Sequence, residues 1–384
     1  MESKRKVFIG LSGGVDSSVS AALLKQSGYD VTGVFIKVWQ PDFIECTWKQ
    51  DRLDAMRVAS VLDIPFITLD LEKEYKEGVI DYMISEYRSG RTPNPDVMCN
   101  REVKFGAFLK WIEKQDKNAY VATGHYAMIA KNHPANVVAG PNEKIHRTTT
   151  YDSSSHLPAP SHQNNFLQSF CLRKSKDENK DQTYFLWTLT QEQLSKIIFP
   201  IGEMEKSHVR ELAREFNLPV SEKKDSQGLC FVGTIDVKTL LKNYIKEKRG
   251  DVKNESGDVI GSHDGVTFFT IGERHGFTIT KKTIEDKPYF VVAKNFEENT
   301  LIVSNNPPHE KDGNIISLEK INWTKEIKKG EVYEARARYR APLAKVEAIN
   351  EKEMKVVSGE LTATPGQSLV LYDGELCIGG GIIG

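Results

Sequence analysis

The sequence predicts an α/β protein that begins with a doubly wound parallel sheet and ends in a small β domain. Strand-like and helix-like segments alternate over the first ~130 residues, which is typical of parallel strands joined by helices. A serine- and glycine-rich turn joins the first strand to the first helix. In the last third, short alternating runs separated by Gly, Asn and Asp indicate strands, barrel-like by their number.

The N-terminal elements follow from the spacing of apolar residues. After the first strand and helix, we expect strands at 31–39, 65–71 and 119–127 and helices at 51–62, 75–88 and 101–113. Ligands of such sheets bind at the carboxyl ends of the strands. Gly10 and Gly124 each stand at one of these ends, so the sequence predicts a site between them.

Beyond this domain the pattern changes twice. Residues 132–168 are rich in Pro, Asn, Ser, Thr and His, and we expect a long surface insertion whose irregularly spaced histidines are solvated loop residues rather than metal ligands. Helices are then expected at 192–198 and 206–216. The strands of the last third are expected at 266–271, 289–293, 300–303, 333–339, 345–349, 354–357 and 368–372.

Composition excludes several classes of protein. A chain of 384 residues is expected to form two or three domains, and its formal net charge of −1 gives no global basic surface for nucleic acid. Any RNA contact must therefore use a local patch. No apolar run is long enough for a membrane span. The 5 cysteines are scattered, which fits neither a secreted disulfide framework nor a zinc site, so we expect a cytoplasmic protein.

The turn at residues 12–18 is the first candidate site. Gly13 and Gly14 let the backbone turn tightly and present N–H groups to an anion at a helix N-terminus. The serines add hydroxyl donors, and Asp16 is placed to hold Mg²⁺ against phosphates. The spacing fits neither the P-loop nor the dinucleotide motif. An ordinary βα turn is the alternative, and the flanking serines and acid favour a phosphate loop.

The second candidate site is the segment 90–100, which contains Cys99. Pro93 and Pro95 predict a stiff loop between two helices. Cys99 would then lie just before a helix near Arg101, whose dipole would lower the thiol pKa, and Asp96 could accept a proton. The alternative is that Cys99 is a small buried apolar residue.

Cys230 is a third candidate because it lies in a polar loop that also carries Lys223 and Lys224. Cys46, Cys171 and Cys377 lack such surroundings, and we expect them to be structural.

Six segments, taken in chain order, resemble the motifs of bacterial and mitochondrial tRNA-specific 2-thiouridylases: 12–17, 90–100, 122–127, 180–182, 225–233 and 364–367. The first resembles the PP-loop of enzymes that split ATP into AMP and pyrophosphate. The resemblance implies a PP-loop ATP-binding domain at 1–218 with its insertion, a small central domain at 219–278 that carries the second cysteine loop, and a tRNA-contacting β-barrel at 279–384.

The resemblance also implies a reaction. ATP would adenylate the 2-oxygen of the wobble uridine and release pyrophosphate. Cys230 would carry sulfur as a persulfide, which attacks directly or is reduced by Cys99 to hydrosulfide. AMP would leave, and a transient Cys99–Cys230 disulfide would remain. Asp96 would act as general acid or base for the target base.

The family's remaining functional residues map onto three sets of positions. ATP would contact Gly10, Leu11, Ser12, Gly13, Gly14, Val15, Asp16, Ser17, Ile36 and Gly124, where Ile36 replaces the family's usual Met. The target base would contact Asn94, Pro95 and Asp96. The tRNA would contact His125, Lys180, Asp181, Gln182, Arg338, Tyr339 and Gln367.

Arg336, Arg338 and Arg340 alternate along an expected strand. They would form either a phosphate-contacting stripe or a solvated barrel face.

The implied co-substrate is ATP with Mg²⁺, without a permanent cofactor. The implied partners are tRNA, with those for Lys, Glu and Gln as acceptors, and a sulfur-carrier protein or cysteine desulfurase. The protein itself is expected to be a monomer. Two alternatives stay open. Another adenylating PP-loop enzyme that uses nitrogen would leave Cys99 and Cys230 unexplained. A nucleotide- and RNA-binding sensor would show no turnover.

Overall fold

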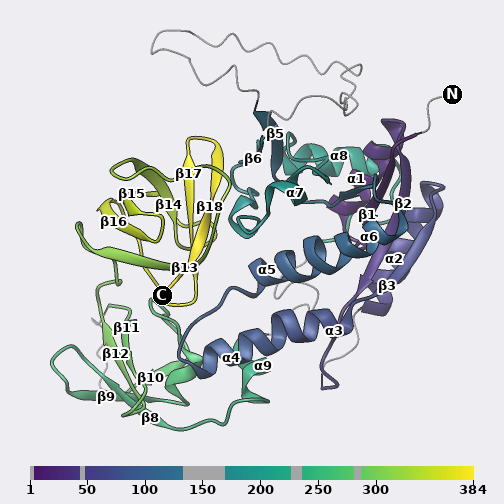
Figure 1. Cartoon of the computed structure of the whole chain (residues 1–384). Helices are drawn as coiled ribbons and strands as arrows, with labels where there is room; N and C mark the ends of the chain where they lie inside the picture. The colour runs from purple at the N-terminus through teal and green to yellow at the C-terminus, as the bar shows by residue number, and fades with distance from the viewer. Residues whose placement is uncertain (1–3, 44–47, 133–168, 226–235, 281–286) are drawn as a thin grey trace.

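The computed structural model describes residues 4–43, 48–132, 169–225, 236–280 and 287–384. Cys46, Cys230 and the expected insertion, apart from its edges, lie outside the described residues. Figure 1 shows a parallel sheet near the N-terminus, a central sheet and a C-terminal barrel, with two long helical rods running from the parallel sheet towards the other two parts.

The N-terminal domain is built on a parallel sheet of five strands in the order β3-β2-β1-β4-β7. The chain moves outward from β1 in one direction and then returns to add β4 on the other side. The carboxyl ends of β1 and β4 therefore form the switch point at which such sheets bind ligands. The strands are β1 Lys6–Gly10, β2 Asp30–Lys37, β3 Phe66–Asp70, β4 Tyr120–Ala122 and β7 Ile197–Ile198.

Both faces of this sheet are covered, which confirms the doubly wound fold. Side chains alternate along β1: Phe8 lies in one apolar core, whereas Val7 and Ile9 lie in another. The core around Val7 contains side chains of α1 Val15–Gln26, α2 Trp48–Val61 and α8 Lys206–Glu215. The two rods lie on the face of Phe8.

The first rod consists of α3 Glu72–Tyr75, a π-helical segment Lys76–Asp81 and α4 Tyr82–Arg88. The second consists of α5 Pro95–Met98, a π-helical segment Cys99–Ala107 and α6 Phe108–Gln115. The prediction of a loop over 90–100 was wrong from Pro95 onward, where α5 begins. Proline at the first helical position lacks only an N–H that the helix does not use, and its fixed φ suits the helix.

The short segment before α8 also differs from its prediction. The helix expected at 192–198 is the single turn α7 Gln191–Leu194, and Ile197–Ile198 forms β7 beside β4. Two β-branched residues at the sheet edge extend the parallel sheet instead of the helix.

The central domain contains α9 Val237–Lys242 and a second sheet of five strands in the order β10-β9-β8-β12-β11. The strands are β8 Gly250–Lys253, β9 Val259–His263, β10 Phe277–Ile279, β11 Phe290–Asn295 and β12 Thr300–Ser304. The expected boundary at 278/279 falls inside β10 of this one sheet. The strand expected at 266–271 contains a 3₁₀ turn, Val266–Phe268.

The C-terminal domain is a closed six-stranded barrel in the order β13-β16-β15-β14-β17-β18, with β13 paired to β18. A hairpin of β5 Met128–Asn132 and β6 Ser169–Arg173 adds to β18 from outside. The barrel strands are β13 Ile315–Trp323, β14 Val332–Arg336, β15 Ala344–Asn350, β16 Glu353–Ser358, β17 Ser368–Asp373 and β18 Leu376–Ile383.

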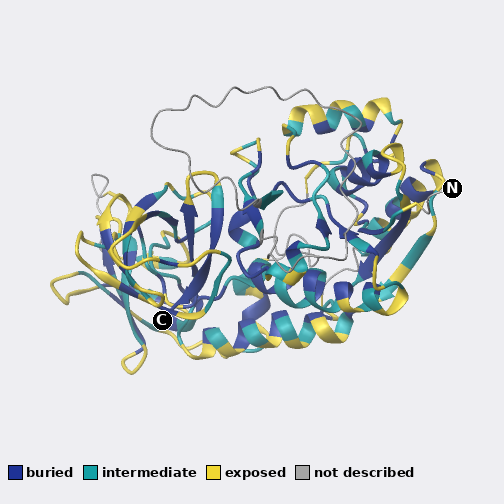
Figure 2. Cartoon of the chain, turned by 45° about the horizontal axis from the view of Figure 1, so that its top comes forward, coloured by how far each residue is buried: buried dark blue, intermediate teal, exposed yellow. Residues whose placement is uncertain are grey.

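Burial follows these layers, with dark blue strands and inner helix faces inside yellow outer turns (Figure 2). Among the residues that the structure describes, no helix combines the length and the apolar character of a membrane span.

Candidate functional site

The serine- and glycine-rich turn connects β1 to α1 at the switch point. Gly13 has a φ of 76°, in the left-handed region that favours glycine, and Gly14 precedes α1 without a side-chain cap on the helix. The Ser17 hydroxyl accepts the N–H of Ser12 at 3.2 Å, and the Ser18 hydroxyl donates to the Gly14 carbonyl at 2.7 Å. These bonds hold the turn so that the first amides of α1 stay available to an anion.

Two glycines allow other backbone to approach this turn closely. A Cβ on Gly13 would lie 2.3 Å from the carbonyl oxygen of Asp51 in α2. A Cβ on Gly124, in the loop after β4, would lie 2.6 Å from the backbone nitrogen of Ser17. Gly124 thus lies against the first turn of α1, as the predicted site between the strand ends requires. Ile36 is buried near the end of β2.

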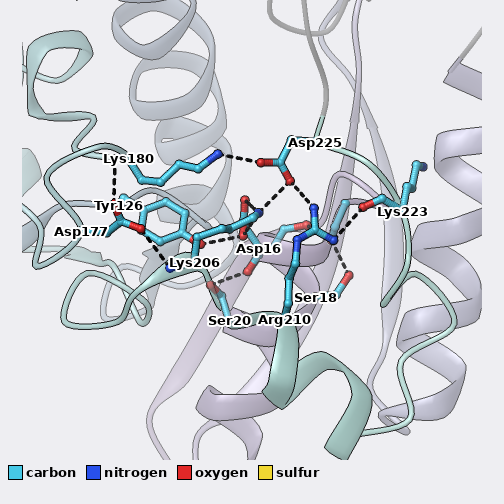
Figure 3. A network of polar contacts seen from close by, with 12 residues as sticks. Asp16, Ser18, Ser20, Tyr126, Asp177, Lys180, Lys206, Arg210, Lys223 and Asp225 are labelled. Carbon is cyan, nitrogen blue, oxygen red and sulfur yellow. Dashed lines mark hydrogen bonds and ion pairs between the residues drawn. The ribbon is translucent and has the colours of Figure 1, made fainter. Parts of the chain in front are cut away.

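Asp16 takes part in a polar network that the sequence did not reveal (Figure 3). Its carboxylate accepts the Tyr126 hydroxyl at 2.9 Å and the Lys206 amine at 2.7 and 2.8 Å. The same amine lies 2.9 Å from Asp225. Lys206 carries no motif, and only the packing of α8 beside α1 brings it here. Asp225 did belong to a matched segment.

Asp225 also accepts Lys180 at 2.7 Å and Arg210 at 2.8 Å. Burial acts to raise the pKa of Asp225, but the hydrogen bonds from Lys180 and Lys206 outweigh it and lower this pKa to about 2. Lys180, a predicted tRNA contact, is therefore linked through Asp225 and Lys206 to Asp16 in the turn at residues 12–18, which we name the nucleotide turn after its predicted ligand.

The expected magnesium ion would meet two carboxylates here, Asp16 and Asp225, and both are already paired with Lys206. No group of three or more His, Cys, Asp or Glu side chains suited to a metal occurs in the part of the chain that the structure describes. These two carboxylates do not make a resident metal site, so Mg²⁺ stays a prediction as part of the nucleotide, held mainly by phosphate oxygens.

The target-base segment forms the start of the second rod. The Asn94 side chain accepts the N–H groups of Asp96 at 3.1 Å and Val97 at 3.2 Å, and so caps the helix that begins at Pro95. Cys99 follows the 4 residues of α5 and is 0% exposed. Because helix-terminal charge acts mainly within the first turn, it favours anions at Asp96 more than at Cys99.

Both the barrel and the central domain hold the chain just before this segment. The Thr92 N–H donates to the Pro365 carbonyl at 2.8 Å, and the Gln367 amide donates to the carbonyls of Thr92 at 2.9 Å and Pro93 at 3.2 Å. From the central domain, the Lys294 amine donates to the Gly90 carbonyl at 3.0 Å. Gln367 thereby positions the loop, and its predicted tRNA contact stays a prediction.

The loop after β4 connects the two candidate sites. The His125 ring is 7% exposed, lies 2.7 Å from the Thr123 hydroxyl and packs against Phe105 of the second rod. Burial, reinforced by the positive charge of Lys104, lowers the pKa of His125 well below 6.5, so the ring is neutral at pH 7. This placement favours a role in shaping the loop, and a direct tRNA contact stays a prediction.

Two further predicted tRNA contacts support backbone. Asp181 is 3% exposed and accepts the Ser175 N–H at 3.1 Å and the Thr183 hydroxyl at 2.8 Å. Burial raises the pKa of Asp181 despite these bonds. The Gln182 side-chain oxygen accepts the Tyr126 N–H at 2.9 Å.

The three arginines do not form the expected stripe, because β14 ends at Arg336. The Arg338 guanidinium donates to the Ile271 carbonyl of the central domain, and Arg340 has a φ of 60° and donates to the Asn179 carbonyl at 3.0 Å. The ring of Tyr339, the remaining predicted tRNA contact, lies 4.4 Å from that of Phe185.

Three family models match the chain in sequence. They are described as tRNA methyl transferase HUP domain, over residues 5–234, tRNA methyl transferase PRC-barrel domain, over 238–305, and Aminomethyltransferase beta-barrel domain, over 314–383. The second match ends at residue 305 and the third begins at 314, which coincides with the change of sheet between β12 and β13.

Curated relatives match nearly the full length. The tRNA-specific 2-thiouridylase MnmA of Listeria monocytogenes is 40% identical over 388 residues, which cover 98% of this chain and 94% of the relative. The protein of the same name from Streptococcus equi subsp. zooepidemicus is 40% identical over 390 residues, covering 99% and 95%.

Proposed function

The chain belongs to the family of tRNA-specific 2-thiouridylases, and we propose that it replaces the 2-oxygen of the wobble uridine of tRNA with sulfur at the expense of ATP. The match to curated relatives over 98% of the chain carries this proposal. The geometry supports it, because the nucleotide turn and Phe105, six residues after Cys99 in the second rod, contact the same loop after β4.

ATP binds at the switch point in this proposal. The amides at the start of α1, with residues 10–17, hold the phosphates, and Ile36 and Gly124 line the adenosine pocket. Mg²⁺ enters with the nucleotide. The uridine 2-oxygen attacks the α-phosphorus, the bond to the pyrophosphate breaks, and Asp96 accepts the proton from the uridine N–H.

The adenylated carbon is then open to sulfur. The terminal sulfur of a Cys230 persulfide bonds to this carbon, and the bond to AMP breaks. The Cys99 thiolate attacks the Cys230 sulfur, so that the electrons of the persulfide bond stay with the transferred sulfur. In the other order, Cys99 first releases hydrosulfide, which then attacks. Both orders leave a Cys99–Cys230 disulfide, which a thiol reductant must reopen.

The partners follow from this chemistry. A sulfur-carrier protein or a cysteine desulfurase supplies the persulfide, and tRNAs for Lys, Glu and Gln accept the sulfur. The protein acts as a monomer in the cytoplasm, where thiols are kept reduced. The tRNA lies near Lys180 and the barrel turn of Arg338 and Tyr339, whereas the buried Asp181 and the half-buried Gln182 support that surface.

The test compares Cys99→Ser and Cys230→Ser with the wild type in cells that lack their own enzyme, with 2-thiouridine in tRNA measured by mass spectrometry. Wild type should restore 2-thiouridine and each variant should lose it. Cys377→Ser, which changes a buried thiol in the barrel, is the control and should retain it. Full 2-thiouridine with both test variants, or none with a wild type that binds ATP, would contradict the proposal.

A further inference from the structure

Three cationic side chains converge on the carboxylate of Asp225, next to the N-terminus of α1 (Figure 3). Lys180, Lys206 and Arg210 lie 2.7, 2.9 and 2.8 Å from its oxygens. The Lys206 side chain is only 13% exposed, and those of Lys180 and Arg210 are 30% and 28% exposed. Partly desolvated cations attract anions more strongly than cations in bulk water do.

Lys206 is the member of this cluster nearest the nucleotide turn. Its amine contacts both carboxylate oxygens of Asp16, which belongs to the first turn of α1 directly after Gly14. The backbone N–H of Lys206 donates to the Asp177 carboxylate at 3.0 Å. The backbone of Lys206 is therefore anchored while its long side chain reaches the phosphate-binding end of α1.

The charges do not balance within the cluster. Among the described residues, three cations share the carboxylate of Asp225, and Lys206 alone of the three is paired with a second one, that of Asp16. The neighbouring Asp177 carboxylate accepts the backbone N–H groups of Lys180 and Lys206. A triphosphate brings more negative charge and more acceptor oxygens than a single carboxylate, and phosphate suits the fork of an arginine. The anion that this cluster fits is thus larger and more charged than the side chain it holds.

We propose that Lys206 and Arg210 bind the β- and γ-phosphates of ATP, and that Asp225 neutralises them until the nucleotide arrives. This inference rests on the proposed use of ATP. As the uridine attacks, negative charge develops on the leaving pyrophosphate, and both cations stabilise it. AMP lacks these two phosphates, so Asp225 regains its partners and AMP leaves readily.

Binding of ATP, inorganic pyrophosphate and AMP to the full chain tests this, with calorimetry as the readout. Lys206→Met keeps an apolar stem without the charge and should weaken ATP and pyrophosphate about tenfold or more, the effect of a lost charge-assisted hydrogen bond. AMP affinity should stay unchanged. Lys206→Arg should retain most of the preference for ATP over AMP.

Asp225→Asn gives the sharper result, because it breaks the same ion pair from the other side. If Asp225 competes with phosphate, this variant should bind ATP about threefold or more tightly than wild type. If the pair merely stabilises the fold, both substitutions should change ATP affinity in the same direction. Arg214→Met, one turn further along α8 in an exposed pair with Glu222, is the matched control and should leave all three affinities unchanged.

Equal losses of ATP and AMP affinity in Lys206→Met, or weaker ATP binding in Asp225→Asn, would overturn this inference. The proposed function would still stand if the wild type thiolates tRNA. A wild type that binds no ATP would overturn this inference together with the proposed use of ATP.

Discussion

Gly124→Ala tests whether the loop after β4 sets the geometry of the nucleotide turn. The added methyl carbon would lie 2.6 Å from the Ser17 nitrogen and 2.7 Å from the Asp16 carbonyl carbon. Ordinary contact for such a carbon begins at 3.4 Å, and both neighbours are backbone atoms that cannot rotate away. The first turn of α1 must therefore shift by several tenths of an ångström.

Overpacking of this kind costs about 1–3 kcal/mol of stability. The shift also moves the amides that would hold the phosphates, so we expect ATP affinity to fall by about tenfold, the equivalent of about 1.4 kcal/mol. Thermal unfolding gives the first quantity and calorimetric titration with an ATP analogue gives the second.

Gly10→Ala is the steric control for stability. Its methyl carbon would meet its nearest neighbours, on Phe108 and Thr123, at an ordinary 3.8 Å. The unfolding temperature should fall in Gly124→Ala and stay near that of wild type in Gly10→Ala. ATP affinity unchanged by Gly124→Ala would refute the argument that this loop positions the turn.

Three further outcomes are expected. Asn94→Ala should cost about 1 kcal/mol in chemical unfolding through the lost helix cap, whereas Asn94→Asp keeps the acceptor, and equal stability of the two would contradict the cap. Because the pKa of His125 is lowered in the fold, the unfolded chain binds its proton more readily, and stability should fall by up to about 1.4 kcal/mol per pH unit below the unfolded pKa near 6.5. His125→Gln should reduce this loss of stability between pH 7 and pH 5, measured by unfolding, whereas His208→Gln, at an exposed position, should not. An unaltered pH dependence of stability in His125→Gln would contradict the role of the buried His125 ring. Burial raises the pKa of Cys377 to about 12, so iodoacetamide should spare this thiol in the folded protein, as peptide mass spectrometry would show; rapid alkylation there would exclude a buried thiol.

The parallel sheet and the nucleotide turn could be predicted because their signals are local. An apolar strand, paired glycines and an amphipathic helix specify the turn within about twenty residues, and repetition of strand and helix specifies the sheet. The start of the helix at Pro95 carried an equally local signal. Asn94 is a favourable cap and proline suits the position after it, so the pair indicates a helix start, whereas proline considered alone predicts a loop.

The charge network could not be predicted, because its partners are chosen by packing. Asp16 and Lys206 are 190 positions apart, and nothing near either residue specifies the other. The same holds for Arg338, whose strand ends two residues before it and whose guanidinium is used inside the molecule. From the sequence alone such a cation is expected at the surface, because the carbonyl group that accepts its hydrogen bond lies far away in the chain.

The attachment of the 90–94 loop to the barrel has a consequence for synthesis. Thr92 and Gln367 are 275 positions apart, so the ribosome must add 275 residues after Thr92 before this contact can form. A nascent chain can complete β1, α1 and β4, and with them the glycine turn, long before Asn94 and Cys99 acquire their support. A chain that stops short of Pro365 would retain the glycine turn and lack the contacts of Pro365 and Gln367 that hold Thr92 and Pro93. Synthesis as far as Gln367 is thus a condition for fixing the 90–94 loop.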